Sequence, residues 1–291
     1  GTCFFCNGLS YVAVLVGLWM MQLHEARPAV HVRGWHTLME GARYAFGSPA
    51  IRPILLLVAV VSLVGTPYSA LMPLFAVRNL HGDAGMLGLL TAAGGVGALT
   101  AALYMAARKS VRGLGRVIAA APVVLGLGLA VFAFSTTLWL SLPALAAIGF
   151  AIMAQMASCN TILQTIVDED KRGRVMSFYA TAFLGLAPVG ALVAGLLAQA
   201  IGASPPGAGA LADFFGRYHV GASITTAAGG LICIAAAAAF AWRLERIREH
   251  IRPIYRRMGI LPEVADGIQQ ASDPRTGVFA AVEPVAKAPK D

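Results

Sequence analysis

Charged residues are scarce in this sequence. Asp, Glu, Lys and Arg make up only 12% of its 291 residues, whereas about 25% is usual in a soluble domain. Hydrophobic residues account for 58%, and the mean hydropathy is +0.72. So little charge excludes an ordinary soluble domain and predicts an all-α membrane protein. The net charge of +8 does not indicate a nucleic-acid partner, because the basic residues stand in short stretches beside apolar ones.

Charged side chains are missing from the interior of the apolar stretches. All 14 Asp and Glu residues lie outside them. An acid within a membrane span would suggest a proton relay or a sodium site, so we expect neither in this chain. The sequence also has no Ser-His-Asp arrangement, no HExxH motif and no cluster of metal ligands. We therefore expect no catalytic residue, no metal and no cofactor, and an intramembrane enzyme is the weakest hypothesis.

The four cysteines lack the setting of a reactive site. Cys159 and Cys233 stand alone in apolar stretches, and the Cys3–Cys6 pair has no second pair or histidine cluster near it in the sequence. Thiols in such surroundings act as small hydrophobic side chains. A metal or redox site at Cys3 and Cys6 is the weaker alternative.

Seven apolar stretches are long enough to cross a bilayer as helices, which takes about 20 residues. They are residues 2–23, 52–77, 85–107, 115–135, 138–166, 174–201 and 219–242. We divide the chain into a first helix (1–24), a linker (25–50), a six-helix bundle (51–243) and a C-terminal segment (244–291). Within the linker, the apolar spacing over Gly34–Phe46 predicts a short helix on the membrane face, with a solvated loop as the alternative.

The basic residues predict the orientation. All 22 Lys and Arg residues except Arg78 and Arg217 fall in the linker, in alternate loops or after the last span. The positive-inside rule places these segments, including the C-terminus, in the cytoplasm. Apolar residues at Leu244, Ile247 and Ile251 alternate with arginines, which predicts a basic amphipathic helix on the membrane surface. The chain from about residue 262 is predicted to be disordered.

Polar residues inside two spans mark candidate binding faces. The second span carries Ser62, Thr66 and Ser69 at positions that share one helical face. In the fifth span, Gln155, Ser158 and Thr161 gather on one side and Asn160 and Gln164 on roughly the opposite side. Buried amides need partners in lipid, so one face should line a water-filled cavity and the other should pack against a helix. The sequence leaves open which does which; we assign the substrate cavity to Ser62, Thr66, Ser69, Gln155, Ser158 and Thr161, and packing to Asn160 and Gln164.

Two further motifs concern packing and gating. Gly185, Pro188 and Gly190 predict a kink in the sixth span, where Ala187, Ala191 and Gly195 form a stripe of small residues for helix packing. Between the fifth and sixth spans, the charged turn 168–174 predicts a cytoplasmic gate that forms in one conformation and breaks in another. Its candidate residues are Asp168, Arg172, Gly173 and Arg174, and a simple positive-inside anchor is the alternative.

Several segments carry a family resemblance. They are Arg52-Pro-Ile-Leu-Leu-Leu, Pro67-Tyr-Ser-Ala-Leu-Met-Pro73-Leu-Phe, Gly88-Leu-Leu-Thr-Ala-Ala-Gly94, Asn160-Thr-Ile-Leu-Gln164 and Arg172-Gly-Arg-Val-Met-Ser177. In this order they resemble the C-terminal half of a major facilitator superfamily transporter, of the enterobactin-exporter or transmembrane secretion effector branch. The likeness covers residues 1–242, and Asn7-Gly-Leu-Ser-Tyr11 resembles that branch's sixth helix.

The resemblance implies a twelve-helix protein of which this chain holds helices six to twelve, with two inverted three-helix repeats. It also implies that the second and fifth spans line a central cavity. Gly185-x-x-Pro188-x-Gly190 loosely resembles the family's antiporter motif. The loop Arg108–Arg116 lacks the Asp of the family's loop pattern, which argues against a full gate there.

Our leading hypothesis is a secondary active exporter of small molecules, such as drugs, macrolides or siderophores, in a bacterial inner membrane. It would work by alternating access, with membrane lipids and a missing N-terminal half as partners. We interpret the chain, which opens on Gly1, as a fragment of that protein. The alternative is a non-transporting receptor or scaffold on the same fold.

Overall fold

The structure is a computed structural model that describes residues 2–20, 34–108, 110–111, 113–202 and 220–257. It separates into two compact units, Gly1–Glu40 and Gly41–Asp291. The first unit holds α1 (Thr2–Met20) and the start of α2 (Gly34–Gly47). The predicted basic residues at 27, 33, 109, 112 and 217 and the tail from 258 lie outside the described residues. The side chains of Cys3 and Cys6 and of residues 245–257 are also undescribed.

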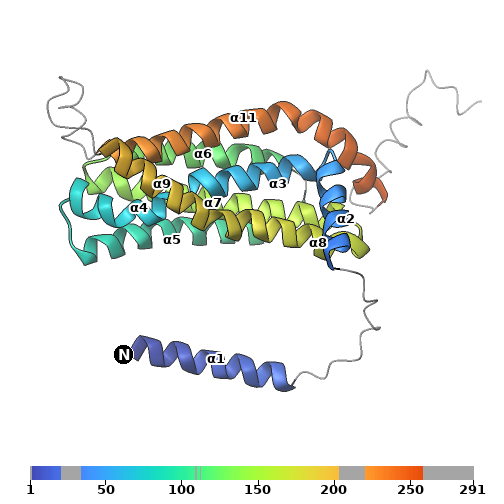
Figure 1. The fold of residues 1–291 in the computed structure, drawn as a ribbon, viewed down its shortest axis with the longest axis horizontal. Coiled ribbons are helices and arrows are strands. Elements are labelled where there is room, and N and C mark those ends of the chain that lie inside the picture. The colour runs from blue at the N-terminus through green and yellow to red at the C-terminus, as the bar shows by residue number, and fades with distance from the viewer. Residues whose placement is uncertain (1, 21–33, 109, 112, 203–219, 258–291) are drawn as a thin grey trace, which may run out of the picture. The chain divides into compact units, whose positions relative to one another are not determined.

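The second unit is a bundle of six helices that are long and apolar enough to cross a membrane. The first is a composite of α3 (Ile51–Val60), η1 (Val61–Gly65), α4 (Tyr68–Leu74) and η2 (Phe75–Asn79). It is followed by α5 (Ala84–Ala107), α6 (Leu114–Phe134) and α7 (Leu138–Ile166). The fifth is a composite of α8 (Glu169–Ala180), η3 (Thr181–Gly185) and α9 (Leu186–Gly202), and α11 (Val220–Arg257) is the last. In Figure 1, α6 and α11 lie along one side of this bundle and α5 along the opposite side.

These helices confirm the predicted all-α membrane fold. The six predicted spans from residue 52 onward match the apolar, membrane-spanning parts of the observed helices to within five residues at each end. The predicted first span corresponds to α1, whose described apolar part, Asn7–Met20, is a shorter helix. The predicted linker helix is confirmed as α2, whereas the predicted amphipathic helix after residue 244 is a direct continuation of α11.

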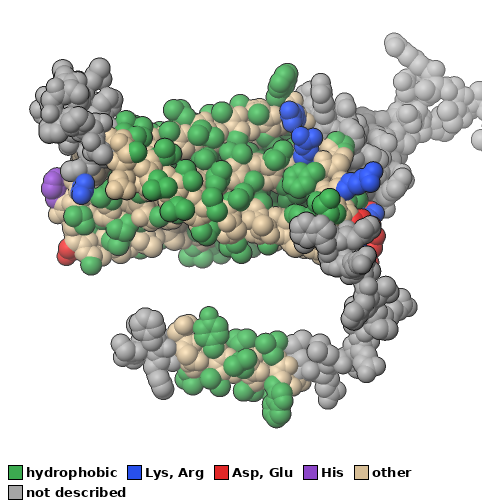
Figure 2. Space-filling view, in the orientation of Figure 1, with side chains coloured by type: hydrophobic (Ala, Val, Ile, Leu, Met, Phe, Trp, Pro, Cys, Tyr) green, Lys and Arg blue, Asp and Glu red, His purple; other side chains and the backbone are tan. Residues whose placement is uncertain are grey.

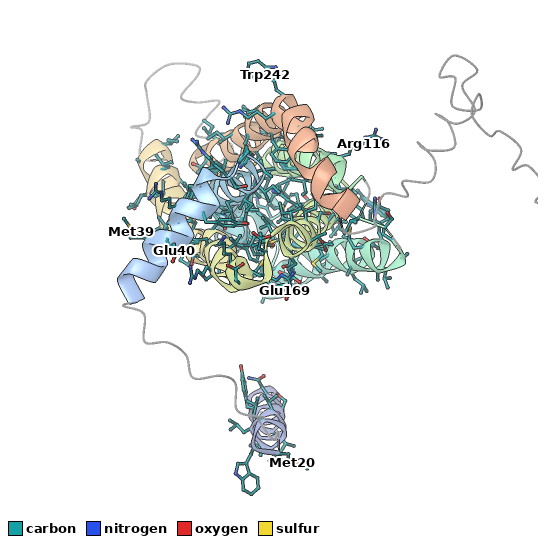
Figure 3. The ribbon with its side chains drawn as sticks, turned by 90° about the vertical axis from the view of Figure 1, so that its right-hand side faces the viewer. Met20, Met39, Glu40, Arg116, Glu169 and Trp242 are labelled. Atoms are coloured by element: carbon teal, nitrogen blue, oxygen red, sulfur yellow. The ribbon has the colours of Figure 1, made fainter. Side chains whose placement is uncertain are left out.

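The outer surface of the bundle suits a bilayer. Trp139 and Trp242, near opposite ends, have 91% and 86% of their side chains exposed, and Trp242 points away from the helices in Figure 3. Exposed tryptophans at both ends are typical of the two membrane interfaces. Figure 2 shows charged side chains gathered toward the ends of the bundle, with a band of hydrophobic side chains between them.

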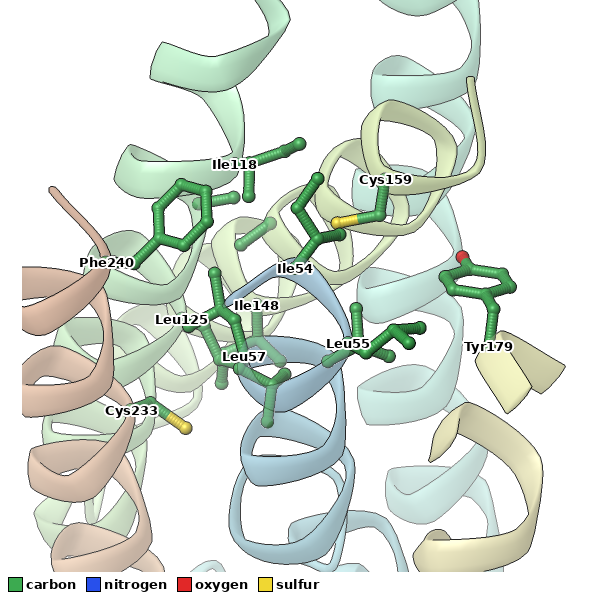
Figure 4. Close-up of a cluster of buried hydrophobic side chains, with 14 of the residues drawn as sticks. Ile54, Leu55, Leu57, Ile118, Leu125, Ile148, Cys159, Tyr179, Cys233 and Phe240 are labelled. Atoms are coloured by element: carbon green, nitrogen blue, oxygen red, sulfur yellow. The ribbon is translucent and has the colours of Figure 1, made fainter. Parts of the chain in front are cut away.

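The centre of the bundle is α3. Its Ile54, Leu55 and Leu57 are at most 3% exposed, and Figure 4 shows them among side chains from α6, α7, α8 and α11. Cys159 and Cys233 belong to the same buried cluster and are free thiols, as expected of small hydrophobic residues. The composite helix that begins with α3 therefore contributes buried side chains to a core that it shares with α6, α7, α8 and α11.

Glycines bring the helix backbones into direct contact. A Cβ at Gly97 of α5 would overlap the Ala146 carbonyl of α7, and a Cβ at Gly149 would overlap the Gly94 carbonyl. A Cβ at Gly126 of α6 would overlap the Gly230 carbonyl of α11 in the same way. Membrane helices associate by such close packing, since lipid provides no hydrophobic drive between them.

The small residues that pack in the sixth span stand one position before those that we predicted. Gly190 and Ala194 are the buried small residues of α9, and Gly190 lies against the Leu63 carbonyl of η1. Ala187, Ala191 and Gly195 are only partly buried. Periodicity finds stripes of small residues on a helix, but the tertiary contact decides which stripe faces a neighbour.

The glycine contacts can be tested with two alanine substitutions in α5. Gly97→Ala forces a methyl group into the Ala146 carbonyl, and we expect an overpacking cost of about 1–3 kcal/mol, seen as a lower melting temperature in detergent. Gly95→Ala is the matched control, because no described atom lies within 4 Å of a Cβ at Gly95. Equal melting temperatures for the two variants would contradict the α5–α7 packing.

Candidate functional site

Three of the predicted cavity residues meet in the middle of the bundle. Ser62, Thr66 and Gln155 line one small cavity of about 10 Å³ between η1, α7 and η3, a volume close to that of a single water molecule. The Ser62 hydroxyl donates a hydrogen bond to the Phe183 carbonyl of η3. The Thr66 hydroxyl donates to the Ser62 carbonyl at 2.7 Å. We call this group the central polar cluster.

Two π-helical segments create this cluster. η1 and η3 end shortly before Pro67 and Pro188 respectively, and proline has no N–H to donate and crowds the preceding turn. In a π-helix the Phe183 carbonyl would pair with the N–H of residue 188, but proline has none. This carbonyl accepts a hydrogen bond from the Ser62 hydroxyl. Single π turns of this kind are frequent at functional sites. The π turn η3 lies where Gly185 and Pro188 predict a kink.

The Gln155 side chain is the unusual member of the cluster. It is 2% exposed, and neither its Nε2 nor its Oε1 atom has a hydrogen-bond partner among the described residues. Leaving a buried polar group unpaired costs about 1–3 kcal/mol, so native proteins rarely keep one without a reason. The Gln155 amide therefore has no protein partner among the described residues, although it borders the small cavity.

The other three predicted cavity residues lie elsewhere. Ser69 is exposed and donates to the Thr66 carbonyl at 2.9 Å. Ser158 is buried and points to the Met105 sulfur of α5, 3.7 Å away. Thr161 is exposed and donates to the Ala157 carbonyl at 2.8 Å. The sequence placed Ser69 on the face of Ser62 by counting α-helical steps, but η1 adds a residue per turn and rotates Ser69 away.

The structure corrects the expected packing role of Asn160 and Gln164. Their side chains hydrogen-bond to each other, Gln164 Nε2 to Asn160 Oδ1 at 2.8 Å, on the open side of α7. With Met153, Ala157 and Thr161 they form a partly or fully exposed stripe at helical spacing. We call this stripe the open face of α7. It is polar at the end nearer α8, whereas the Gln155 and Ser158 side is packed inside the bundle.

Further exposed hydroxyls lie on α8 and at the start of η3, and the sequence analysis missed them. Ser177 and Thr181 are exposed and bond to the helix's own carbonyls at 2.7 and 2.9 Å. Their spacing of four residues was the available signal. Because both residues can satisfy their hydroxyls within the helix, spacing alone did not distinguish them from ordinary polar positions.

The predicted gate turn is in fact the start of a helix. Glu169–Ala180 forms α8, with Asp168 as its N-cap and Gly173 inside it. Glu169 and Asp170 in the first turn favour this because acidic side chains complement the helix dipole. Gly173 therefore makes no turn. An ion pair at this end of α8 joins Lys171 Nζ to Asp170 at 3.9 Å. The buried Nε atom of Arg172 has no hydrogen-bond partner within the described chain.

The linker helix α2 contacts the gate candidate Asp168. The Tyr44 hydroxyl donates to the Asp168 carboxylate at 3.3 Å, and the Lys171 ammonium lies 4.7 Å from the centre of the Tyr44 ring. Burial, and then the Asp168 charge, raise the pKa of the Tyr44 phenol above its ordinary value. The phenol is therefore neutral and remains a hydrogen-bond donor at physiological pH.

Packing strengthens this contact between α2 and α8. Ala45 is fully buried, and the Phe46 and Phe178 rings meet edge to face with their centres 6.3 Å apart. A Cβ on Gly41 would lie 3.2 Å from the Cβ of Arg174. The sequence predicted the helix but not its partner, because the contact joins residues more than 120 positions apart.

Residues 1–215 match the family described as "Transmembrane secretion effector". The chain belongs to this branch of the major facilitator superfamily. It is similar to the "Multidrug efflux pump Tap" of Mycolicibacterium fortuitum, with 30% identity over 175 residues. That alignment covers 57% of this chain and 40% of the relative, so the chain spans about two fifths of the relative's length. No solved structure matches the chain.

This transmembrane secretion effector shows no metal site in the part of the chain that the structure describes, where no group of three His, Cys, Asp or Glu side chains could hold an ion. Three arrangements are the candidate functional features of the described residues, and the first two carry no charged side chain. They are the central polar cluster, the open face of α7 and the docking of α2 on α8. The family assignment points to transport rather than to catalysis.

The docking of α2 can be tested by a disulfide. We expect Gly41→Cys and Arg174→Cys to cross-link under mild oxidation in a background without the native cysteines, since the two Cβ atoms lie close to the roughly 3.5–4.5 Å that a disulfide needs. Loss of maleimide labelling, restored by reductant, measures it. Gly47→Cys with Arg174→Cys is the control, as no described atom lies within 4 Å of a Cβ at Gly47. Equal cross-linking of both pairs would refute the docking.

Proposed function

We propose that this chain forms one side of a secondary active exporter of small molecules that works by alternating access. The family assignment supports a transporter, and the similar protein carries the name of a multidrug efflux pump. In this proposal a second half, absent from the chain, completes the pathway. The bundle would lie in a bacterial inner membrane.

The open face of α7 is the observation that carries the proposal. Asn160, Thr161 and Gln164 place two amides and a hydroxyl on an exposed part of a membrane-spanning helix. Amide groups facing hydrocarbon are costly, so polar residues in spans normally face the bundle interior or water. A water-filled pathway between two halves satisfies this requirement, and it places the substrate against α7.

Alternating access also needs a second arrangement of the same helices. The central polar cluster supports one, because the Gln155 amide is buried without a partner while the Ser62 and Thr66 hydroxyls beside it are already paired. Rotation of η1 or η3 at its π turn would offer the amide a new partner. We propose that Gln155 is paired in the alternative conformation.

The side chains indicate the class of substrate. The polar groups on the open face are neutral, and the charged residues of the six spans lie near their ends. We therefore propose a neutral or amphiphilic substrate, such as a drug, a macrolide or a siderophore. Proton coupling, if the exporter uses it, would need an acidic residue from the other half.

Two contacts between segments support the proposed orientation of the bundle, with its basic end in the cytoplasm. Tyr44 of α2 meets Asp168 at one end of the bundle. A Cβ on Gly115, at the start of α6, would lie 3.2 Å from Leu244, at the end of the last span. The basic residues therefore gather around one end, which the positive-inside rule assigns to the cytoplasm. The C-terminus would then be cytoplasmic.

Replacing Gln155 by Met separates stability from transport. Met has a similar shape and needs no hydrogen bond, so we expect the melting temperature of Gln155→Met to equal or exceed that of the unmodified protein. Efflux of a fluorescent drug from cells should fall at least fivefold, because the alternative conformation loses its hydrogen bond. Thr66→Val in the same cluster is the companion variant. Unchanged efflux in Gln155→Met, at equal expression, would reject the role of Gln155.

Cysteine accessibility tests the aqueous pathway. We expect Thr161→Cys, on the open face of α7, to react with a charged thiol reagent in cell membranes and to be protected by a transported drug. Leu127→Cys is the control, because this 56% exposed side chain lies on α6, which packs mainly on α7 and α11. It should face lipid and remain unlabelled. An unreactive Thr161→Cys in folded protein would refute the pathway along α7.

A further inference from the structure

A second cavity lies on the other side of η1 from the central polar cluster. It has a volume of about 140 Å³ and lies between η1–α4, α9 and α11. It shares no lining residue with the cavity around Gln155. The lining residues that matter for the argument are Pro67, Tyr68, Gly190, Ala194, Thr226 and Gly229.

Two glycines explain why there is space here. Gly190 of α9 lies against the Leu63 carbonyl, and Gly229 of α11 lies against the Val64 carbonyl. Both helices therefore touch η1 with bare backbone at neighbouring positions. Neither can carry a side chain there that would fill the space between them, and a larger residue at either glycine would push the helices apart.

The mouth of the cavity is apolar and opens at the surface of the bundle. Val193, Leu197 and Ile232 line it and have 46%, 48% and 47% of their side chains exposed. These residues lie on the apolar spans formed by α9 and α11. A lipid acyl chain is the occupant whose chemistry matches an apolar opening on membrane-spanning helices.

The Thr226 hydroxyl, in the lining of the cavity, needs a hydrogen-bond acceptor. It is 4% exposed and its hydroxyl has no hydrogen-bond partner within the described residues, whereas the neighbouring Thr225 hydroxyl donates to the Gly221 carbonyl at 2.7 Å. Thr226 stands five residues after the start of the span at Gly221, which is about 7.5 Å along the helix. That depth is close to the boundary between headgroups and hydrocarbon, where phospholipid ester carbonyls lie.

We propose that this cavity binds the acyl chain of a membrane phospholipid, with the ester carbonyl accepting a hydrogen bond from Thr226. An apolar cavity of about 150 Å³ accommodates benzene, so the space suits roughly the first six carbons of the chain. The lipid comes from the leaflet at the end opposite α2. It fills the gap between α9 and α11, and this site is separate from the proposed transport pathway.

Photo-cross-linking tests the site in full-length protein in phospholipid nanodiscs. The probe is a phosphatidylglycerol with a diazirine near the ester end of one chain. We expect the label on α9 and α11 peptides that contain Ala194 and Thr226. Ala194→Leu fills the cavity and should lower the labelling at least fivefold, whereas Ala200→Leu, on the exposed surface of the same helix, should leave it unchanged.

The ester carbonyl has its own test. Thr226→Val keeps the shape of the side chain and removes the hydroxyl, so labelling by the ester probe should fall about threefold. Labelling by the ether-linked analogue, which has no carbonyl, should be the same in Thr226→Val and the unmodified protein. This isosteric variant keeps the proposal testable if Ala194→Leu does not fold.

Three outcomes would overturn the proposal. Equal labelling of the Ala194→Leu and unmodified proteins would show that the chain does not enter the cavity. Equal effects of Thr226→Val on the ester and ether probes would remove the role of the carbonyl. Displacement of the label by a transported drug, but not by excess phospholipid, would identify the occupant as substrate.

Discussion

Direct contact between helix backbones is the constraint on which this bundle depends. Lipid is as apolar as the side chains, so the helices gain no hydrophobic energy by pairing and rely on close packing. Glycines allow this close packing where α5 crosses α7, where α6 crosses α11, and where α9 and α11 meet η1. Each crossing fixes two helices at the distance of their main chains. The spaces that remain, around Gln155 and around Thr226, are the two cavities of the described bundle discussed above.

Proline places the polar centre of the bundle. Pro67 and Pro188 follow the π turns η1 and η3, where the backbone hydrogen-bond pattern changes and a carbonyl becomes available to a side chain. Ser62 takes that carbonyl and Gln155 is left without a partner. Main-chain groups in a membrane must be paired within the protein. The two π turns therefore place a paired hydroxyl and an unpaired amide side by side in the bundle.

One helix connects the linker to this polar centre. α8 contacts α2 through Phe178 and continues directly into η3, which carries the Phe183 carbonyl. These two residues are five positions apart, or about 7.5 Å along a helix. The α2 contact and the Ser62–Phe183 hydrogen bond therefore lie on one continuous helical stretch. The linker and the central polar cluster are mechanically adjacent although their residues are far apart in the sequence.

The sequence by itself determined the class of protein, the six long spans, the linker helix and the family, because length, hydropathy and local motifs are properties of neighbouring residues. It also identified Ser62, Thr66 and Gln155 as a polar group. It could not decide that Asn160 and Gln164 lie on the open side of α7, that Gly190 rather than Ala191 meets η1, or that Tyr44 binds Asp168. Those outcomes depend on how each helix is rotated against its neighbours. A π turn alters that rotation, and contacts between residues distant in the chain fix it, so only the tertiary structure contains the answer.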